Sequence, residues 1–581
     1  MLIKLLGGAL RRQEPAAADV AAALQRADDE ESAGRLEQAV AAYRAALAAD
    51  PGNAIGWNNL GWVLQRLERL DDALESYQQA VALVPDLIVA RNNVGTIFRL
   101  RGDLDAARAE YESALQAAPR DALTHLNLGT VLLKQAEAEG ALAHFREAVS
   151  CAPQMEDAHR ALLLALNFLP GVEPAEAYAH YRAWGARCAA RIRPHLRETA
   201  PRSGTDRDPE RRLRIGYVSP DFRQHAMAGF IEQALANHGV TIVDVFCYDN
   251  SPASDAVTAR MKAYGATWRA IRQLDDAAAA ALIERDHIDI LVDLAGHTVG
   301  ERLELFARRP APVQASLLGY LNTTGLEAID YRICDLWSDP PGVAERFHVE
   351  RLWRVPGSFW CFLPPADAPA VSMLPALAAR HITCCSFNNF TKLNHSVTAA
   401  WAALLSRCPG SRLIVAAVPE GASRERFLQR FVSSGVDPSR IELMGRLPQA
   451  AFRELHHRVD IALDPFPYAG GATSCESLWM GVPVVTLAGS FGFARSGASI
   501  LQCLGLDRLV TEEVGEYVDC AARLAGDLVA LQAMRAGMRE RILASELADG
   551  PRFAAKLEDA YRGMWRDHCG MMRAETSQPG R

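Results

Sequence analysis

Several features that mark common functional classes are scarce or missing in this chain of 581 residues. No run of 18 uninterrupted apolar residues occurs, so the sequence predicts no helix that crosses a membrane. Basic residues do not exceed acidic ones, with 62 Lys plus Arg against 70 Asp plus Glu, which argues against a general nucleic-acid binder. The 12 cysteines include no Cys-x-x-Cys pair, so neither a zinc site nor a disulfide framework is indicated. These absences favour a soluble cytoplasmic protein.

Short catalytic motifs of several enzyme classes are missing too. The chain has no Gly-x-x-x-x-Gly-Lys-Ser/Thr loop, no cluster of metal-ligating residues and no Gly-x-Ser-x-Gly elbow. We therefore expect no metal site and no metal cofactor. What the sequence does contain is apolar residues, at 49% of all positions, which is enough for several packed cores and excludes disorder of the whole chain.

A repeat of 34 residues occupies the N-terminal part. The positions that keep this interval are Pro51, Pro85, Pro119 and Pro153; Gly61, Gly95 and Gly129; and Tyr43, Tyr77, Tyr111 and Phe145. Small residues let paired helices approach, the aromatic ring fills the space between them, and proline ends the second helix. This pattern of helix, turn and helix resembles the tetratricopeptide repeat, and we predict four copies over residues 18–153.

Three asparagines, Asn59, Asn93 and Asn127, also recur at intervals of 34 residues. Each lies two residues before the glycine that keeps the same interval. This places it on the first helix of its repeat, which lines the groove of such solenoids. Because a carboxamide both donates and accepts hydrogen bonds, this ladder could bind the backbone of an extended acceptor peptide whatever its side chains. The alternative is that each asparagine only satisfies a neighbouring helix.

The rest of the chain alternates between short apolar runs and helices, the pattern of parallel α/β sheets. We predict a helical continuation and linker over residues 154–211, then one Rossmann-like lobe over 212–380 and a second over 381–568. The predicted strands are 213–219, 241–248, 288–295, 313–318 and 331–334, then 381–387, 412–418, 441–444, 461–465 and 483–487. Ligands of such units bind at the carboxyl ends of the strands, and two units in tandem form a cleft between them.

Polar residues follow two predicted strands of the first lobe. His225 lies in the loop after residues 213–219, where an imidazole could accept a proton from a hydroxyl group or orient an acceptor chain. Asn322, Thr323 and Thr324 follow residues 313–318 in a small polar loop that could hold a sugar or phosphate group. The alternatives are a surface histidine and an ordinary turn.

In the second lobe, Lys392 follows the first predicted strand and could offset the charge of a bound diphosphate. Residues 464–476 read as strand end, glycine turn and helix, so that Thr473 lies where free amides could bind phosphate. Glu476, in the first turns of that helix, could accept hydrogen bonds from ribose hydroxyls. Alternatively, the lysine is solvated and the glutamate simply favours the start of a helix.

The combination of repeats and motifs resembles the O-GlcNAc transferase/SPINDLY family over nearly the whole chain. The segments that carry the resemblance are Arg214–Phe222, Arg308–Gln314, Phe387–Asn389 with Lys392, and Cys475–Thr486. The resemblance implies a tetratricopeptide superhelix joined to a GT-B glycosyltransferase. It also implies metal-independent transfer of a sugar, with inversion, from a nucleotide donor to Ser or Thr of proteins.

The resemblance also implies roles for individual residues. His225 matches the active-site histidine of the family, and Lys392 matches the lysine that contacts the donor diphosphate. Asn389 occupies a neighbouring donor-site position, and Thr473 and Glu476 fall in the phosphate and ribose segment. Asp286 falls near an acidic residue for which a catalytic role has been considered, although its place before a strand favours a surface role.

Several positions depart from the family pattern, namely Leu321, Gln449, Phe452, Gly471, Ala472 and Glu476. The loops at 319–325 and 466–470 look closer to the SPINDLY branch, which resembles the transferases in fold and uses GDP-fucose. We predict a protein O-glycosyltransferase with UDP-GlcNAc as the donor. A SPINDLY-like O-fucosyltransferase and a tetratricopeptide adaptor with an inactive catalytic module are the alternatives. Expected partners are protein acceptors and a nucleotide sugar, without nucleic acid or membrane, and a homodimer remains open.

Overall fold

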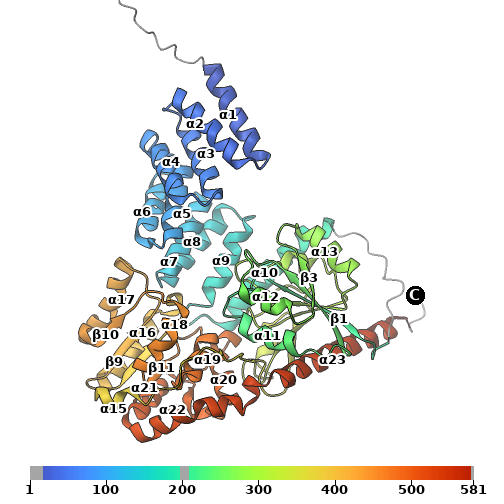
Figure 1. Ribbon diagram of the computed structural model, residues 1–581, viewed down its shortest axis with the longest axis vertical. Helices are drawn as coiled ribbons and strands as arrows, with labels where there is room; N and C mark the ends of the chain where they lie inside the picture. The colour runs from blue at the N-terminus through green and yellow to red at the C-terminus, as the bar shows by residue number, and fades with distance from the viewer. Residues whose placement is uncertain (1–16, 196–207, 577–581) are drawn as a thin grey trace, which may run out of the picture. The chain divides into compact units, whose positions relative to one another are not determined.

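The computed structural model describes residues 17–195 and 208–576 (Figure 1). The chain divides into two compact units, Met1–Gln135 with Gly140–Ala158 and Ala136–Glu139 with His159–Arg581. Part of the predicted linker, residues 196–207, lies outside the described residues. No helix in the described ranges is long and apolar enough to cross a membrane.

The first unit is built from antiparallel helix pairs. Its helices are α1 (Ala17–Ser32), α2 (Leu36–Ala49), α3 (Ala54–Arg66), α4 (Leu70–Leu83), α5 (Ile88–Arg101), α6 (Leu104–Ala117), α7 (Ala122–Lys134) and α8 (Ala138–Cys151). Side chains of Asn53, Asp103 and Asp121 cap three of these helices by accepting a hydrogen bond from a backbone amide of the first turn. The helical repeat predicted from the 34-residue period is confirmed.

The period has a direct packing cause. A Cβ atom at Gly61 would lie 2.7 Å from the ring of Tyr77, and one at Gly95 would lie 2.6 Å from the ring of Tyr111. Gly129 stands in the same relation to Phe145, at 2.6 Å. Each glycine of a first helix therefore makes room for the aromatic ring of the second helix, which is fully or almost fully buried.

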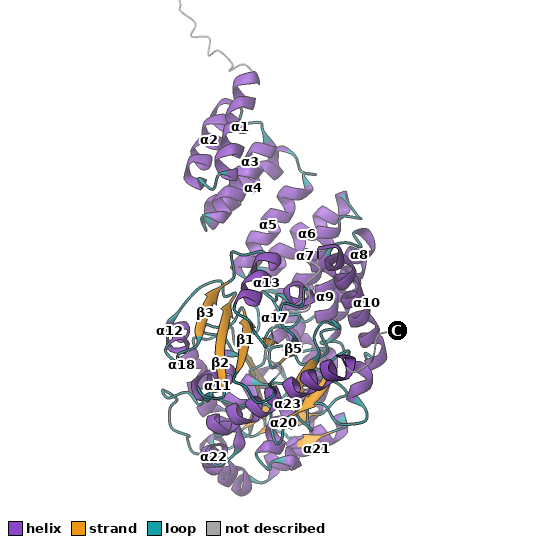
Figure 2. Cartoon of the chain, turned by 90° about the vertical axis from the view of Figure 1, so that its right-hand side faces the viewer, coloured by secondary structure: helices purple, strands orange, loops and turns teal. Residues whose placement is uncertain are grey.

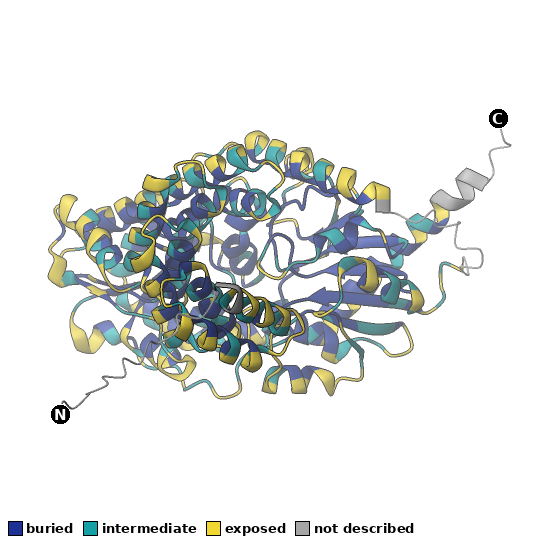
Figure 3. Ribbon diagram, turned by 90° about the horizontal axis from the view of Figure 1, so that it is seen from above, coloured by how far each residue is buried: buried dark blue, intermediate teal, exposed yellow. Residues whose placement is uncertain are grey.

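The boundary between the units falls within α9 (Glu156–Leu166), which is followed by α10 (Pro174–Ile192) and the first lobe. Its parallel sheet contains β1 (Leu213–Ser219), β2 (Val243–Asp249), β3 (Thr267–Ala270), β4 (Ile290–Asp293), β5 (Val313–Ser316), β6 (Tyr331–Cys334) and β7 (Arg351–Arg354). The spatial order is β3-β2-β1-β4-β5-β6-β7. Figure 2 shows β1, β2 and β3 side by side, and Figure 3 shows buried strands between helices with exposed outer faces.

The second lobe repeats this architecture. Its strands are β8 (Thr383–Ser386), β9 (Arg412–Val415), β10 (Ile441–Leu443), β11 (Ile461–Leu463), β12 (Val484–Leu487) and β13 (Val510–Thr511), in the spatial order β10-β9-β8-β11-β12-β13. All pairs are parallel, so the prediction of two Rossmann-like units is confirmed. The long helix α23 (Gly550–Thr576) follows the second lobe and packs along α11 (Ala228–Asn237) of the first (Figure 1).

The strands β3, β7 and β13 were not predicted from the sequence. β3 and β7 are the two edge strands of the first sheet, and their residues are partly or fully exposed. β13 is an edge strand of only two residues. Edge strands bury less surface than central ones, so they lack the continuous apolar run by which the central strands were recognised.

Candidate active site

His225 lies in the loop between β1 and α11, at the carboxyl end of the first-lobe sheet. Its Nδ1 atom is 3.3 Å from Oδ2 of Asp221, four residues earlier in the same loop. The His225 side chain is 38% exposed, whereas that of Asp221 is 10% exposed. In the described chain no hydrogen bond reaches Nε2 of His225, so this nitrogen can meet a ligand.

Burial sets the protonation of this pair. It lowers the pKa of His225 and raises the pKa of Asp221, while the attraction between the two groups opposes both shifts. Two groups lie at Nδ1 of His225, because the backbone amide of Met227 also donates to it over 3.4 Å. A neutral imidazole with its proton on Nδ1, toward the carboxylate, would have Nε2 free as an acceptor. The structure thus places a carboxylate beside Nδ1 and leaves Nε2 accessible, and the catalytic role of His225 stays a prediction.

A second histidine that follows a strand of this sheet was not predicted from the sequence. His297 follows β4 and is 3% exposed, and its Nε2 atom lies 2.8 Å from the carbonyl oxygen of Thr324. Burial lowers the pKa of His297 to about 4, so the ring is neutral at pH 7 and donates from Nε2. The spacing Asp293-x-x-x-His297 after a strand repeats that of Asp221 and His225 and was the available signal.

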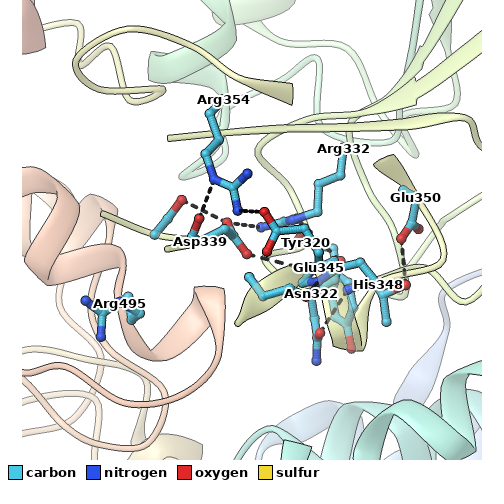
Figure 4. Close-up of polar contacts among 12 residues, drawn as sticks. Tyr320, Asn322, Arg332, Asp339, Glu345, His348, Glu350, Arg354 and Arg495 are labelled. Atoms are coloured by element: carbon cyan, nitrogen blue, oxygen red, sulfur yellow. Dashed lines mark hydrogen bonds and ion pairs between the residues drawn. The ribbon is translucent and has the colours of Figure 1, made fainter. Parts of the chain in front are cut away.

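The predicted sugar or phosphate loop, residues 319–325, follows β5. A Cβ atom at Gly319 would lie 1.8 Å from the carbonyl oxygen of Leu294, so only glycine fits where the loop crosses the end of β4. The buried guanidinium of Arg332 donates to the carbonyl oxygens of Tyr320, at 2.8 Å, and Asn322, at 3.3 Å. This brings the loop against a network of charged residues from the same lobe (Figure 4).

The polar side chains of this loop are engaged within the protein. Thr323 donates to Glu350 over 2.6 Å, and Thr324 donates to the same carboxylate from both its amide, at 2.7 Å, and its hydroxyl. Asn322 donates to Oδ1 of Asn167 at 3.4 Å. All three are buried, with at most 4% of their surface exposed. The structure therefore places Asn322, Thr323 and Thr324 as supports of the loop, and their role as direct ligands stays a prediction.

Lys392 ends the short helix η3 (Phe390–Lys392) after β8. Its ammonium donates to the carbonyl oxygen of Ala469 over 2.8 Å and lies 4.3 Å from the ring centre of Tyr468. Burial lowers the pKa of Lys392 to about 8, against the attraction of the buried Asp464. Both partner residues belong to the glycine turn before α19, so the lysine is brought to the segment where a diphosphate was predicted.

The glycine turn leads into α19 (Ala472–Trp479). Thr473, in its first turn, donates to Oδ1 of Asn388 over 2.9 Å, while Ser474 donates to Asp464 over 2.9 Å. Asn388 is 5% exposed and touches this turn, whereas the predicted donor ligand Asn389 is exposed and caps η3 through the amide of Thr391. Adjacent asparagines after a strand point to opposite sides, which sequence alone did not distinguish.

Glu476 lies one turn further along α19. Its Oε2 atom is 3.6 Å from Nε of Arg453, which also pairs with Asp367 over 2.5 Å. Burial raises the pKa of Glu476, and the Arg453 guanidinium opposes this shift. Phe452 and His456, which flank Arg453 in sequence, pack on each other and on Phe387, with ring centres 4.9 to 5.5 Å apart.

Two further positions were singled out in the sequence. A Cβ atom at Gly471 would lie 3.2 Å from the Trp360 indole, so a side chain there would need this ring to give way. Asp286 accepts from Tyr248 over 2.9 Å and pairs with Arg269 at 2.9 Å, which is a structural role.

The two lobes meet beside these loops. Gln224, next to His225, donates to Gln449 of the second lobe over 3.0 Å. Arg495 donates to the carbonyl oxygen of Trp337 over 2.8 Å. The loop that carries His225 thus touches the second lobe directly, as expected if an acceptor on one lobe meets a donor on the other.

In the repeats, the asparagine ladder is linked from helix to helix. Asn93 donates to Asn58 over 2.9 Å, and Asn127 donates to Asn92 over 3.0 Å. The carboxamide of Asn59 accepts from Asn58 at 3.3 Å. Each ladder residue remains partly exposed, and the side-chain oxygens of Asn93 and Asn127 accept no hydrogen bond from the described residues. The ladder therefore satisfies neighbouring helices and also keeps acceptors for a ligand.

A second row on the same helices was missed in the sequence. Ile55, Val89 and Leu123 lie four residues before the ladder asparagines, so each shares a helix face with its asparagine. Their exposed fractions are 66%, 48% and 47%. Since their positions keep the 34-residue interval, the period could have revealed this apolar row.

Comparison with known proteins agrees with this architecture. The model of glycosyl transferase family 41 matches residues 182–363 and 371–557, and a tetratricopeptide model matches residues 24–88 and 95–156. A structure of a lysine-to-methionine mutant of the Thermobaculum terrenum O-GlcNAc transferase aligns with a TM-score of 0.82 and 33% identity. It covers 89% of this chain and 98% of the other.

Curated relatives include SPINDLY of Petunia hybrida, whose full name is "probable UDP-N-acetylglucosamine–peptide N-acetylglucosaminyltransferase SPINDLY". It is 41% identical over 414 residues, which cover 70% of this chain and 44% of that protein. The protein SEC of Arabidopsis thaliana is 31% identical over 375 residues, 62% of this chain and 38% of its own length. The chain thus spans less than half the length of these relatives.

The family match covers the segment that contains His225, Lys392 and Glu476, and the fold agrees over most of the chain with a solved structure. The resemblance inferred from the sequence is confirmed, and the chain belongs to glycosyl transferase family 41.

Proposed function

We propose that this protein is a protein O-glycosyltransferase that transfers N-acetylglucosamine from UDP-GlcNAc to Ser or Thr hydroxyls of other proteins, with inversion and without a metal ion. The observation that carries the proposal is the position of Lys392. Its ammonium lies at the glycine turn that opens α19, held by Ala469 and beside the ring of Tyr468.

The diphosphate leaving group would bind at this turn. The ammonium of Lys392 and the free amides at the start of α19 would offset the negative charge that develops when the bond to the sugar breaks. Thr473 would add a hydroxyl, and Glu476 would accept hydrogen bonds from the ribose. Asn389 is exposed at the adjoining cap and would contact the donor from the outside.

The acceptor hydroxyl would attack the anomeric carbon from the face opposite the diphosphate. Nε2 of His225 would take the hydroxyl proton or hold the acceptor oxygen in place, while Asp221 keeps the imidazole oriented. Asn59, Asn93 and Asn127, with the apolar row beside them, would bind an extended segment of the acceptor protein.

GDP-fucose is the second candidate donor. This candidate rests on the likeness of the loops at 319–325 and 466–470 to the SPINDLY branch. The SPINDLY protein of Petunia hybrida, 41% identical over 70% of the chain, is itself named for UDP-GlcNAc, which keeps that donor first. The pair Glu476 and Arg453 is compatible with this donor, because a carboxylate can accept two hydrogen bonds from the edge of guanine.

The test is to measure nucleotide release from UDP-GlcNAc, UDP-glucose and GDP-fucose in parallel, with a chelator present, for the wild type and Lys392→Ala. We expect release from one donor, lost in the variant. Release that needs added metal would contradict the mechanism. No release from any donor, even with cell lysate as acceptor, would favour a non-catalytic adaptor.

The acceptor groove needs its own test, since donor chemistry does not involve it. Replacing Asn59, Asn93 and Asn127 together by alanine is expected to weaken transfer to proteins and to leave donor hydrolysis unchanged. Equal loss of both activities would contradict the assignment of the groove.

A further inference from the structure

Two residues between the repeats and the first lobe contact the strand-end loops of both lobes. Asn167 and Phe168 directly follow α9 and are 1% and 8% exposed. They lie outside both family matches, because the tetratricopeptide match ends at residue 156 and the glycosyl transferase match begins at residue 182. Neither residue belongs to a recognised motif, so their burial needs a separate explanation.

Asn167 holds the first-lobe loop. Its amide donates to the hydroxyl of Tyr320 over 2.7 Å, and its oxygen accepts from Asn322 at 3.4 Å and from the hydroxyl of Tyr181 at 3.1 Å. The hydroxyls of Tyr181 and Tyr320 are themselves hydrogen-bonded. One carboxamide thus ties α10 to the loop 319–325. Asn167 precedes this loop in the chain, whereas Arg332 and Glu350, which also support it, follow it (Figure 4).

Phe168 holds the second-lobe turn. Its ring stacks on Tyr468, with centres 5.3 Å apart and planes 16° apart. Tyr468 is the ring beside which the ammonium of Lys392 lies, at 4.3 Å. The stack continues through Phe493, at 5.1 Å from Tyr468, to Phe491, at 4.8 Å from Phe493. Phe168 therefore contacts Lys392 only through one ring, that of Tyr468.

We infer that Asn167 and Phe168 are positioning residues that hold the donor-site loops of the two lobes in register, Asn167 through Tyr320 and Asn322 and Phe168 through Tyr468 and Lys392. The inference rests on the proposed function for its catalytic consequence. Its structural content, that Phe168 controls the environment of Lys392, does not. Adjacent residues on one turn of chain can fix two loops because their side chains leave a turn in different directions.

The physical link to catalysis is burial. The cover that aromatic side chains give to Lys392 excludes water and lowers the pKa of its ammonium. Phe168 packs on Tyr468, the ring that lies against the ammonium of Lys392. Its removal should admit water around the lysine while Tyr468 remains stacked on Phe493, so the lysine should titrate at higher pH.

The titration of Lys392 can be observed without any activity. The chain has five lysines, namely Lys4, Lys134, Lys262, Lys392 and Lys556. In protein labelled with [13C]lysine, the Cε signal of Lys392 can be assigned by comparison with Lys392→Arg and followed with pH. We expect a midpoint near 8 in the wild type. In Phe168→Ala it should rise by about one pH unit.

Phe491→Ala is the matched control, because Phe491 belongs to the same stack but reaches Tyr468 only through Phe493. It should leave the Lys392 midpoint unchanged. Phe168→Leu removes the ring and keeps much of the apolar volume, so it should raise the midpoint by less than Phe168→Ala does, and it is the test if the alanine variant does not fold. An unchanged midpoint in both Phe168 variants would overturn the inference for Phe168.

Asn167→Ala tests whether Asn167 positions the loop 319–325 through Tyr320 and Asn322. We expect kcat/KM for nucleotide release to fall about tenfold in Asn167→Ala and in Phe168→Ala, with the Lys392 midpoint shifted only in the latter. Lower melting temperature with unchanged kcat/KM in both variants would reduce them to structural residues and overturn the inference. If the wild type releases no nucleotide, the proposed function fails, whereas the titration still decides the role of Phe168.

Discussion

The two strand-end loops that look alike in sequence differ in what their polar groups face. The loop 319–325 directs the hydroxyls of Thr323 and Thr324 at the buried carboxylate of Glu350. The turn before α19 instead receives an ammonium, that of Lys392, beside the amides at the start of a helix. The first loop therefore has its hydroxyls held by a buried carboxylate, whereas the second brings a cation and helix amides together.

The difference is sharpest for Lys392. Lys392→Ala is expected to lower kcat/KM for nucleotide release by about 100- to 1000-fold, because a charge that stabilises the leaving group is lost in a site with little water. Release of nucleotide from the sugar donor gives the measurement. Lys262→Ala is the matched control, since Lys262 also lies beside an aromatic ring, that of Trp268 at 5.4 Å, but in the first lobe. Equal effects of both variants would contradict a specific role for Lys392.

Glu350 tests the supporting loop. Glu350→Ala leaves the amide of Thr324 and two buried hydroxyls without their acceptor, so the free energy of unfolding should fall by about 3 kcal/mol. Urea unfolding followed by circular dichroism would measure the loss. Glu350→Gln keeps an acceptor oxygen in the same place and should lose less. If Glu350→Ala unfolds at the wild-type urea concentration, the hydroxyls of this loop are not held as described.

The pH dependence of catalysis tests the charge that Lys392 brings to the turn before α19. The pKa of Lys392 is lowered to about 8, so the ammonium is present below this pH and is lost above it. Thus kcat/KM for the donor, which reports the free enzyme, should be constant just below pH 8 and fall about tenfold for each pH unit above it. Initial rates at low donor concentration between pH 7 and pH 10 would show the decline. A profile that stays flat to pH 10 would exclude a required charge on Lys392.

The smallest effect is expected in the repeats, away from both loops. Replacing Ile55, Val89 and Leu123 by serine should raise KM for protein acceptors about tenfold, because apolar contacts of the bound segment are lost, and should leave donor hydrolysis unchanged. Transfer to a panel of acceptor proteins gives the measurement. Serine at Leu83 and Val84, which are also exposed but end a second helix, is the control. The groove assignment would not survive if the control pair had the larger effect.

Much of the fold was accessible from sequence because periodicity reports packing directly. The interval of 34 residues records the fit of Gly61 against Tyr77 and its equivalents, and the apolar runs record the buried central strands. The edge strands β3 and β7 were missed because they bury too little to leave such a run. The position of Lys392 at a strand end was predictable for the same reason, since strand ends are defined by the buried strands before them.

Other parts of the site were not accessible in this way. Asn388 rather than Asn389 touches Thr473, a choice made by the direction in which each side chain leaves the strand end. His297 resembles any buried histidine until the carbonyl oxygen of Thr324 is placed beside it. Asn167 and Phe168 lie between the tetratricopeptide match and the glycosyl transferase match, and nothing in their local sequence indicates their contacts.

The sequence by itself determined the repeat, the two parallel sheets and the set of strand ends from which a site could be built, because these depend on patterns along the chain. Only the tertiary structure decided which polar groups at those ends are already satisfied. That decision depends on partners far away in sequence, such as Glu350 for Thr323 and Tyr468 for Lys392, and on the burial that gives each contact its strength.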